Sequence, residues 1–129
     1  PDVKVLLRSS YLVREPTPRY ILHGTEGSFL KCGIDPQEEA LKKGELPTLP
    51  NWGAELESQW GLLNTEIEGK HYRGQHPTIN GCYQAYYNNI YSVIRDRAEL
   101  LVTPQHALLV VRIIECAYLS TKVRKAIII

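Results

Sequence analysis

The sequence lacks methionine and has no long hydrophobic run among its 129 residues. Because it opens on Pro1 without any methionine, we expect that it begins downstream of an initiator. No apolar stretch approaches the roughly 18 residues of a membrane-spanning helix, and no secretory signal peptide is recognisable. These absences predict a protein that does not interact with membranes.

An excess of charge of either sign is also lacking. Lys and Arg number 15 against 14 Asp and Glu, a formal net charge of +1 with histidine neutral. Nucleic-acid binding requires a basic excess on one face, so this balance argues against a nucleic-acid partner. A hydrophobic content of 43% with 22% charged residues is typical of a folded protein. The length predicts a single domain over residues 1–129.

Cysteine is scarce, and the three that occur form no known framework. Cys32, Cys82 and Cys116 are odd in number and lack both C-x-x-C spacing and nearby histidine pairs. This pattern indicates reduced, buried thiols in a cytoplasmic protein, rather than disulfides or a zinc site.

Strand character dominates the first half of the chain. Residues 3–14 alternate between two faces, and this period of two predicts a long strand that ends before Pro16. We expect its apolar residues to line the exposed face of a sheet; they are Val3, Val5, Leu7 and Val13. An apolar patch of this kind would favour self-association, at least as a dimer.

Two hairpins are predicted after this strand. Residues 19–23 and 28–32 flank a four-residue turn with a glycine at each end, Gly24 to Gly27. Residues 62–68 and 71–75 flank a second turn at Gly69-Lys70. Between the hairpins, residues 45–61 show no clear period and are predicted to form an ordered, irregular excursion.

Three helices are predicted. Asp35 is a good N-cap for a short helix that ends at Gly44, with Pro36 at its first position and Glu38 able to complete a capping box. In the last third, a helix carries an apolar stripe of Tyr83, Tyr86, Tyr87, Ile90 and Ile94. Thr103 and Pro104 start another, whose expected buried face is Ala107, Val110, Val111, Ile114, Ala117 and Tyr118.

The order of these elements predicts the fold class. A final strand over residues 126–129 would complete an α+β architecture, with a mostly antiparallel open sheet and helices packed on one face.

Familiar catalytic motifs are missing. The glycines form no G-x-G-x-x-G, and no P-loop, H-E-x-x-H or G-x-S-x-G occurs. The histidines are expected to be solvated or structural, and the acidic residues Glu38 and Glu39 suit the positive end of a helix dipole better than a catalytic pair. We therefore predict no catalytic, cofactor-binding or metal-binding residue in this chain.

Two aromatic groups have alternative interpretations. Trp52 and Trp60 lie in the irregular excursion, where indoles either stack on sugar faces or hold a long loop onto a sheet. Four tyrosines crowd one helix, either as core residues or as a ligand or subunit contact; they are Tyr83, Tyr86, Tyr87 and Tyr91.

A connected pattern of motifs then resembles a known family. It runs from Ser28-Phe29-Leu30-Lys31-Cys32-Gly33-Ile34-Asp35-Pro36-Gln37-Glu38 through Trp52-Gly53-Ala54-Glu55 and Trp60-Gly61 to Gly81-Cys82-Tyr83. It continues with Tyr87-Asn88-Asn89-Ile90-Tyr91, Val102-Thr103-Pro104, Arg112-Ile113-Ile114-Glu115 and Ser120. Together these resemble the C-terminal domain of the Gfo/Idh/MocA oxidoreductases, the glucose-fructose oxidoreductase and inositol dehydrogenase superfamily.

The resemblance implies a two-domain enzyme. An N-terminal Rossmann domain, absent from this sequence, would bind NAD or NADP. The C-terminal domain, with the open sheet of the dihydrodipicolinate-reductase-like fold, would shape a pocket for a sugar or polyol and would form the oligomer. The family's catalytic lysine lies in E-K-P and its histidine in D-x-x-x-H, and neither motif occurs here. The chain alone is therefore expected to be catalytically incompetent.

Four residues are candidates for substrate contact. Lys31, Asp35 and Gln37 lie where a strand ends and a helix starts, a place where polar groups converge on a cleft. Trp52 opens the loop that could cap such a cleft. The alternative function is a stand-alone module that binds a ligand or dimerises without catalysis.

Overall fold

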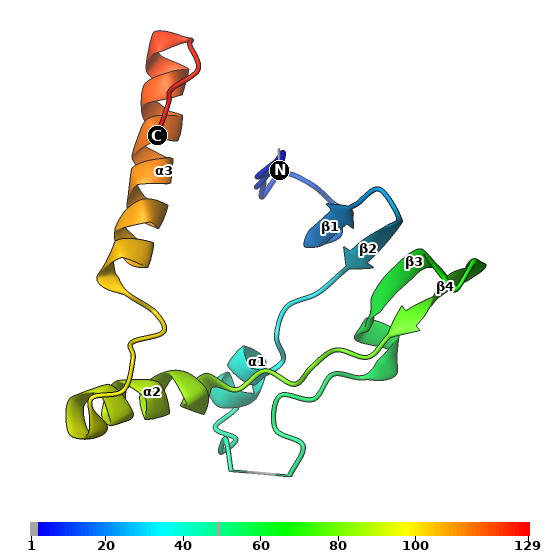
Figure 1. Ribbon diagram of the computed structural model, residues 1–129, viewed down its shortest axis with the longest axis vertical. Coiled ribbons are helices and arrows are strands. Elements are labelled where there is room, and N and C mark those ends of the chain that lie inside the picture. The colour runs from blue at the N-terminus through cyan, green and yellow to red at the C-terminus, as the bar shows by residue number, and fades with distance from the viewer. Residues whose placement is uncertain (1–2, 49) are drawn as a thin grey trace. The chain divides into compact units, whose positions relative to one another are not determined.

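The computed structural model describes residues 3–48 and 50–129 (Figure 1). The chain divides into two compact units, Pro1–Gly81 and Cys82–Ile129, and each is described by itself. The first unit contains a sheet and a short helix, and the second contains two longer helices.

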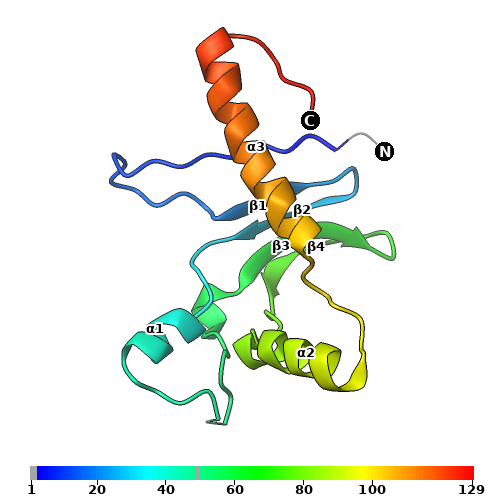
Figure 2. The same cartoon turned by 90° about the vertical axis from the view of Figure 1, so that its left-hand side faces the viewer.

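A four-stranded antiparallel sheet forms most of the first unit. Its strands follow the order β1-β2-β3-β4, so each pairs with its neighbour along the chain (Figure 2). They are β1 (Tyr20–His23), β2 (Gly27–Lys31), β3 (Gly61–Ile67) and β4 (Lys70–His76). Both predicted hairpins are confirmed. The sheet and the three α-helices also confirm the α+β class, whereas packing of the helices on one sheet face stays a prediction.

The second hairpin turns one residue earlier than predicted. Glu68 and Gly69 both have positive φ, 50° and 72°, as a two-residue type I′ turn requires. Ile67 therefore pairs with Lys70, which is the first residue of β4 rather than part of the turn. A glutamate rarely adopts this left-handed conformation, so Glu68 gives no sequence signal for a turn position.

Helix α1 (Gln37–Lys42) follows β2 where the sequence predicts it, and a 3₁₀ turn, Glu57–Gln59, precedes β3. The predicted N-cap is displaced by one residue, because Pro36 and not Asp35 directly precedes the helix, but the Asp35 carboxylate accepts a hydrogen bond from the Gln37 backbone N–H at 2.9 Å. The predicted capping box is wrong. The Glu38 side chain does not return to the start of the helix, because its Oε1 pairs with Lys42 Nζ at 2.9 Å. Hydrogen bonds from Lys42 to Glu38 and Glu39 raise the pKa of that ammonium.

The strand predicted over residues 3–14 is not formed, nor is the one over residues 126–129. Val3 and Leu7 are 79% and 81% exposed, and Leu6 on the other face is 65% exposed. A strand is held by hydrogen bonds to a neighbour, and no described strand pairs with this segment. The alternating pattern is present without the partner that would order it.

The second unit consists of α2 (Tyr83–Asp96) and α3 (Pro104–Val123). Both helices end on a left-handed arginine, Arg97 and Arg124. Asn89 fixes the connection between them, because its amide donates to the Glu99 carbonyl at 2.9 Å and accepts from the Leu101 N–H at 3.0 Å. None of the helices in the described part of the chain is long and apolar enough to cross a membrane.

A capping box starts α3. The Thr103 hydroxyl accepts from the His106 N–H at 3.3 Å, and the Thr103 N–H donates to His106 Nδ1 at 3.4 Å. Replacing Thr103 with alanine should therefore cost about 1 kcal/mol of helix stability. Thermal unfolding followed by circular dichroism would measure this loss. Thr121→Ala is the control, since the Thr121 hydroxyl only bonds the Ala117 carbonyl within the helix; equal effects of the two changes would contradict the capping role.

Burial is unusual in this chain. No apolar side chain of the described residues is fully buried, and the buried polar residues are Lys31 and Gln37. The predicted buried face of α3 is wrong, because Val110, Ile114 and Tyr118 are 58%, 52% and 77% exposed. Helix α3 is apolar around most of its circumference, so periodicity could not single out the covered stripe. The three cysteines are free as predicted, but Cys32 and Cys82 are exposed rather than buried.

Candidate functional site

Lys31 ends β2 and points its ammonium at the irregular excursion that precedes β3. Its Nζ donates to Glu55 Oε1 at 2.9 Å, to the Gln59 carbonyl at 2.8 Å and to the Cys32 carbonyl at 2.9 Å. An ammonium has three donors, so these acceptors use all of them. The residue is only 8% exposed.

Glu55 completes a buried ion pair with Lys31. Its side chain is 6% exposed and that of Lys31 11%. Its second oxygen, Oε2, is buried and accepts no hydrogen bond from the described residues. Removing one partner of such a pair leaves an uncompensated buried charge, which is strongly destabilising.

A second group of polar side chains lies at the start of α1. The Trp52 indole N–H donates to Gln37 Oε1 at 2.8 Å, and Gln37 Nε2 donates to the two Asp35 carboxylate oxygens at 3.0 and 2.9 Å. Gln37 is fully buried, with 1% of its surface exposed. The buried Gln37 amide therefore fixes the Trp52 indole, and the Asp35 carboxylate fixes the amide.

Two glycines allow the chain to pack closely against this group. A Cβ on Gly81 would overlap the Asp35 carboxylate and the Gln37 amide, and one on Gly53 would overlap the Gly81 carbonyl. Gly53 also has a φ of +76°. Three segments of the first unit therefore meet at the buried amide.

A small pocket of about 200 Å³ lies beside the indole. Glu45 is its charged lining residue. The other lining residues are Pro36, Gln37, Ala40, Pro50, Asn51, Trp52, Gly53 and Ala54. A site of this size suits one small group of a ligand rather than a whole cofactor.

The structure brings three of the four predicted contact residues together. Asp35, Gln37 and Trp52 form one hydrogen-bonded group, whereas Lys31 forms a separate group with Glu55. Sequence reasoning missed Glu55, although it stands three residues after Trp52 within the motif Trp52-Gly53-Ala54-Glu55. The irregular excursion has no period that could have indicated which of its residues turns inward.

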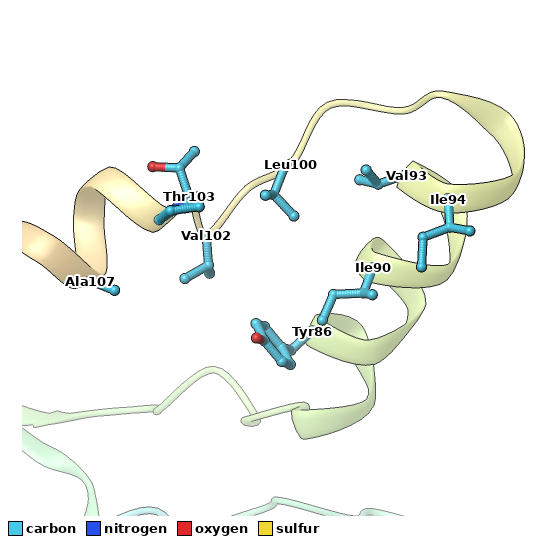
Figure 3. Close-up of a pocket in the computed structure, with 9 residues that line it drawn as sticks. Tyr86, Ile90, Val93, Ile94, Leu100, Val102, Thr103 and Ala107 are labelled. Carbon is cyan, nitrogen blue, oxygen red and sulfur yellow. The ribbon is translucent and has the colours of Figure 1, made fainter.

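Another pocket, of about 430 Å³, belongs to the second unit (Figure 3). Ile90 and Ile94 of α2 point into the same space as Leu100 and Val102 of the connection to α3. Tyr86 also lines it, which places one of the four crowded tyrosines at an apolar surface. The lining offers little for polar recognition.

The part of the chain that the structure describes contains no glycine-rich turn of the dinucleotide-binding kind. The glycines with positive φ lie at positions 33, 44, 53 and 69, and they form no glycine-rich turn between a strand and a helix. Within residues 3–48 and 50–129, no group of three His, Cys, Asp or Glu side chains could hold a metal ion. No chemical step through a cofactor is therefore assigned to these residues.

Comparison with known proteins agrees with the architecture. Residues 2–128 match the family model described as the oxidoreductase family, C-terminal alpha/beta domain. The chain belongs to the Gfo/Idh/MocA family as its C-terminal domain. Since this family model covers almost the whole chain, the resemblance predicted from the motifs is confirmed.

Relatives of this Gfo/Idh/MocA domain are oxidoreductases about three times its length. It is 38% identical to the scyllo-inositol 2-dehydrogenase (NADP⁺) IolW of Bacillus subtilis over 128 residues, which are 98% of this chain and 36% of that protein. A solved structure from Bacteroides fragilis NCTC 9343, described as an oxidoreductase, has a TM-score of 0.85 and 50% identity, covering 90% of this chain and 34% of that one. The B. subtilis protein yvaA has a TM-score of 0.85 at 39% identity, covering 92% and 35%.

Proposed function

We propose that this chain is the substrate-binding and self-associating domain of an NAD(P)-dependent oxidoreductase that acts on a sugar, a polyol or a related compound. The observation that carries the proposal is the family match over residues 2–128, together with relatives of which the chain spans about a third. A cytoplasmic location is part of the proposal, and the three free thiols support it.

The substrate class rests on a relative rather than on a ligand in this chain. The B. subtilis protein is described as a dehydrogenase of scyllo-inositol that uses NADP⁺. Trp52 offers a half-buried indole beside the small pocket, and Asp35 offers a half-buried carboxylate nearby. An aromatic face with adjacent hydrogen-bonding groups suits a polyhydroxylated ring.

Catalysis should require a second domain. We expect that this chain alone reduces no NADP⁺ with scyllo-inositol, because it has neither a dinucleotide site nor the family's catalytic motifs. A protein that joins it to a dinucleotide-binding domain of the family should show turnover, measured by absorbance of the reduced nicotinamide. Turnover by the chain alone would contradict the proposal. Inactivity of both proteins with every polyol tested would favour the module without catalysis.

Self-association is the second part of the proposal. Exposed apolar side chains on strand β1 support it, since Tyr20, Ile21 and Leu22 are 54%, 50% and 60% exposed at an unpaired sheet edge. The segment first expected to line the interface, Val3 to Val13, lies outside the sheet. We expect light scattering to give at least a dimer mass, against 14.7 kDa for one chain. A monomer at high micromolar concentration would contradict this.

A further inference from the structure

We propose that Lys31 and Glu55 are positioning residues that hold the Trp52 side of the substrate pocket, and that neither one touches the substrate. The inference deepens the proposed function, on which its kinetic part rests. It changes the role of Lys31 from a contact residue to a support, and it adds Glu55, which the motif pattern did not single out.

The hydrogen bonds of Lys31 join the end of β2 to the irregular excursion. Its ammonium holds Glu55 Oε1 and the Gln59 carbonyl, and thereby ties two points of the irregular excursion to the end of β2. A third donor goes to the neighbouring Cys32 carbonyl. With three acceptors in place, the ammonium has no donor left for a ligand hydroxyl.

The side chains of Lys31 and Glu55 are both buried. The Lys31 and Glu55 side chains are 11% and 6% exposed, so a substrate cannot reach them without moving the excursion. Trp52, three residues before Glu55, lines the small pocket and is held from the other side by Gln37. The excursion that carries the indole is thus attached to the sheet and to α1 at separate points.

The arrangement predicts how substitutions combine. Lys31→Met leaves the Glu55 carboxylate buried without its partner, and Glu55→Gln does the same to the ammonium. The double variant Lys31→Met/Glu55→Gln removes both charges, so the cost of a buried unpaired charge is relieved, while the hydrogen bond to the Gln59 carbonyl stays lost and recovery is partial. A lysine that bound substrate directly would not be rescued in this way.

The first measurement uses this chain with Trp60→Phe, in which Trp52 is the remaining tryptophan. Acrylamide quenching of Trp52 fluorescence should increase in each single variant and return toward the starting value in the double variant and in Lys31→Arg. The matched control is Lys42→Met, since Lys42 is also ion-paired, with Glu38 and Glu39, but its side chain is 60% exposed. Equal quenching in all variants would overturn the proposal.

The second measurement uses the two-domain protein with scyllo-inositol and NADP⁺. Each single variant should raise KM by about 10-fold, because a displaced pocket wall weakens substrate positioning, while kcat changes less. The double variant should return KM to within about 3-fold of the starting value. A double variant no better than Lys31→Met would assign Lys31 to substrate contact and overturn the proposal.

The two measurements distinguish a failure of the proposed function from a failure of the positioning role. If the unsubstituted two-domain protein shows no turnover, the proposed function fails, and Trp52 quenching still decides whether the pair positions the excursion. If turnover is present but the double variant is not rescued, the proposed function stands and the positioning role is wrong.

Discussion

Replacing Gly53 with alanine should destabilise the first unit by about 2–5 kcal/mol. Two costs add at this position. A φ of +76° places an alanine in the left-handed region, at about 1–2 kcal/mol. The added Cβ would also overlap the Gly81 carbonyl, a backbone atom that cannot rotate away, and such overpacking costs about 1–3 kcal/mol.

Gly33→Ala is the matched control for this prediction. Gly33 has nearly the same φ, +74°, but a Cβ there meets nothing within 4 Å. It should therefore show only the conformational cost, about 1–2 kcal/mol. Urea unfolding at constant protein concentration, followed by tryptophan fluorescence, would compare the two. Equal losses would show that the close approach of Gly53 and Gly81 contributes nothing to stability.

Replacing Gln37 with leucine should also destabilise the first unit strongly. The substitution keeps much of the side-chain volume but removes the acceptor of the Trp52 N–H and the donor to Asp35. Leaving a buried donor and a carboxylate without their partner costs about 1–3 kcal/mol for each group, and more where charge is involved. We expect a loss of about 2–4 kcal/mol and a red-shifted tryptophan emission.

Gln59→Leu serves as the control for the glutamine change. The Gln59 side chain is exposed, and the Lys31 contact uses its backbone carbonyl, which the substitution keeps. Its effect should lie within about 0.5 kcal/mol. If Gln37→Leu proved as mild as this control, the buried amide would not be what holds the indole in place.

The hairpins and helices could be predicted because their signals are local. Glycines at both ends of the first turn, and Thr103 followed by Pro104, determine structure through a few adjacent residues. The second turn lies at Glu68-Gly69 and not at Gly69-Lys70, because Glu68 adopts a positive φ that nothing in the local sequence indicates. Local patterns give the existence of an element more reliably than its limits.

The candidate site could be predicted only in part. Asp35 and Gln37 lie two residues apart, so their proximity follows from the start of α1. Trp52 reaches Gln37 across 15 residues and Lys31 reaches Glu55 across 24, through an excursion without periodicity. Nothing local in the sequence indicates these long-range pairs. The same limit explains the segment before β1, where alternation of residues 3–14 indicates a strand but cannot supply the partner that forms it.

The exposure of the apolar side chains has a thermodynamic consequence. The heat-capacity change of unfolding arises mainly from apolar surface that becomes hydrated, about 12–15 cal/mol/K per residue in ordinary domains. Since no apolar side chain of the described residues is fully buried and many are only half-buried, unfolding of the chain would hydrate less apolar surface than unfolding of an ordinary domain. Calorimetry would then give a low value for the single chain. Any assembly that covers β1 and α3 should raise it in proportion to the area covered.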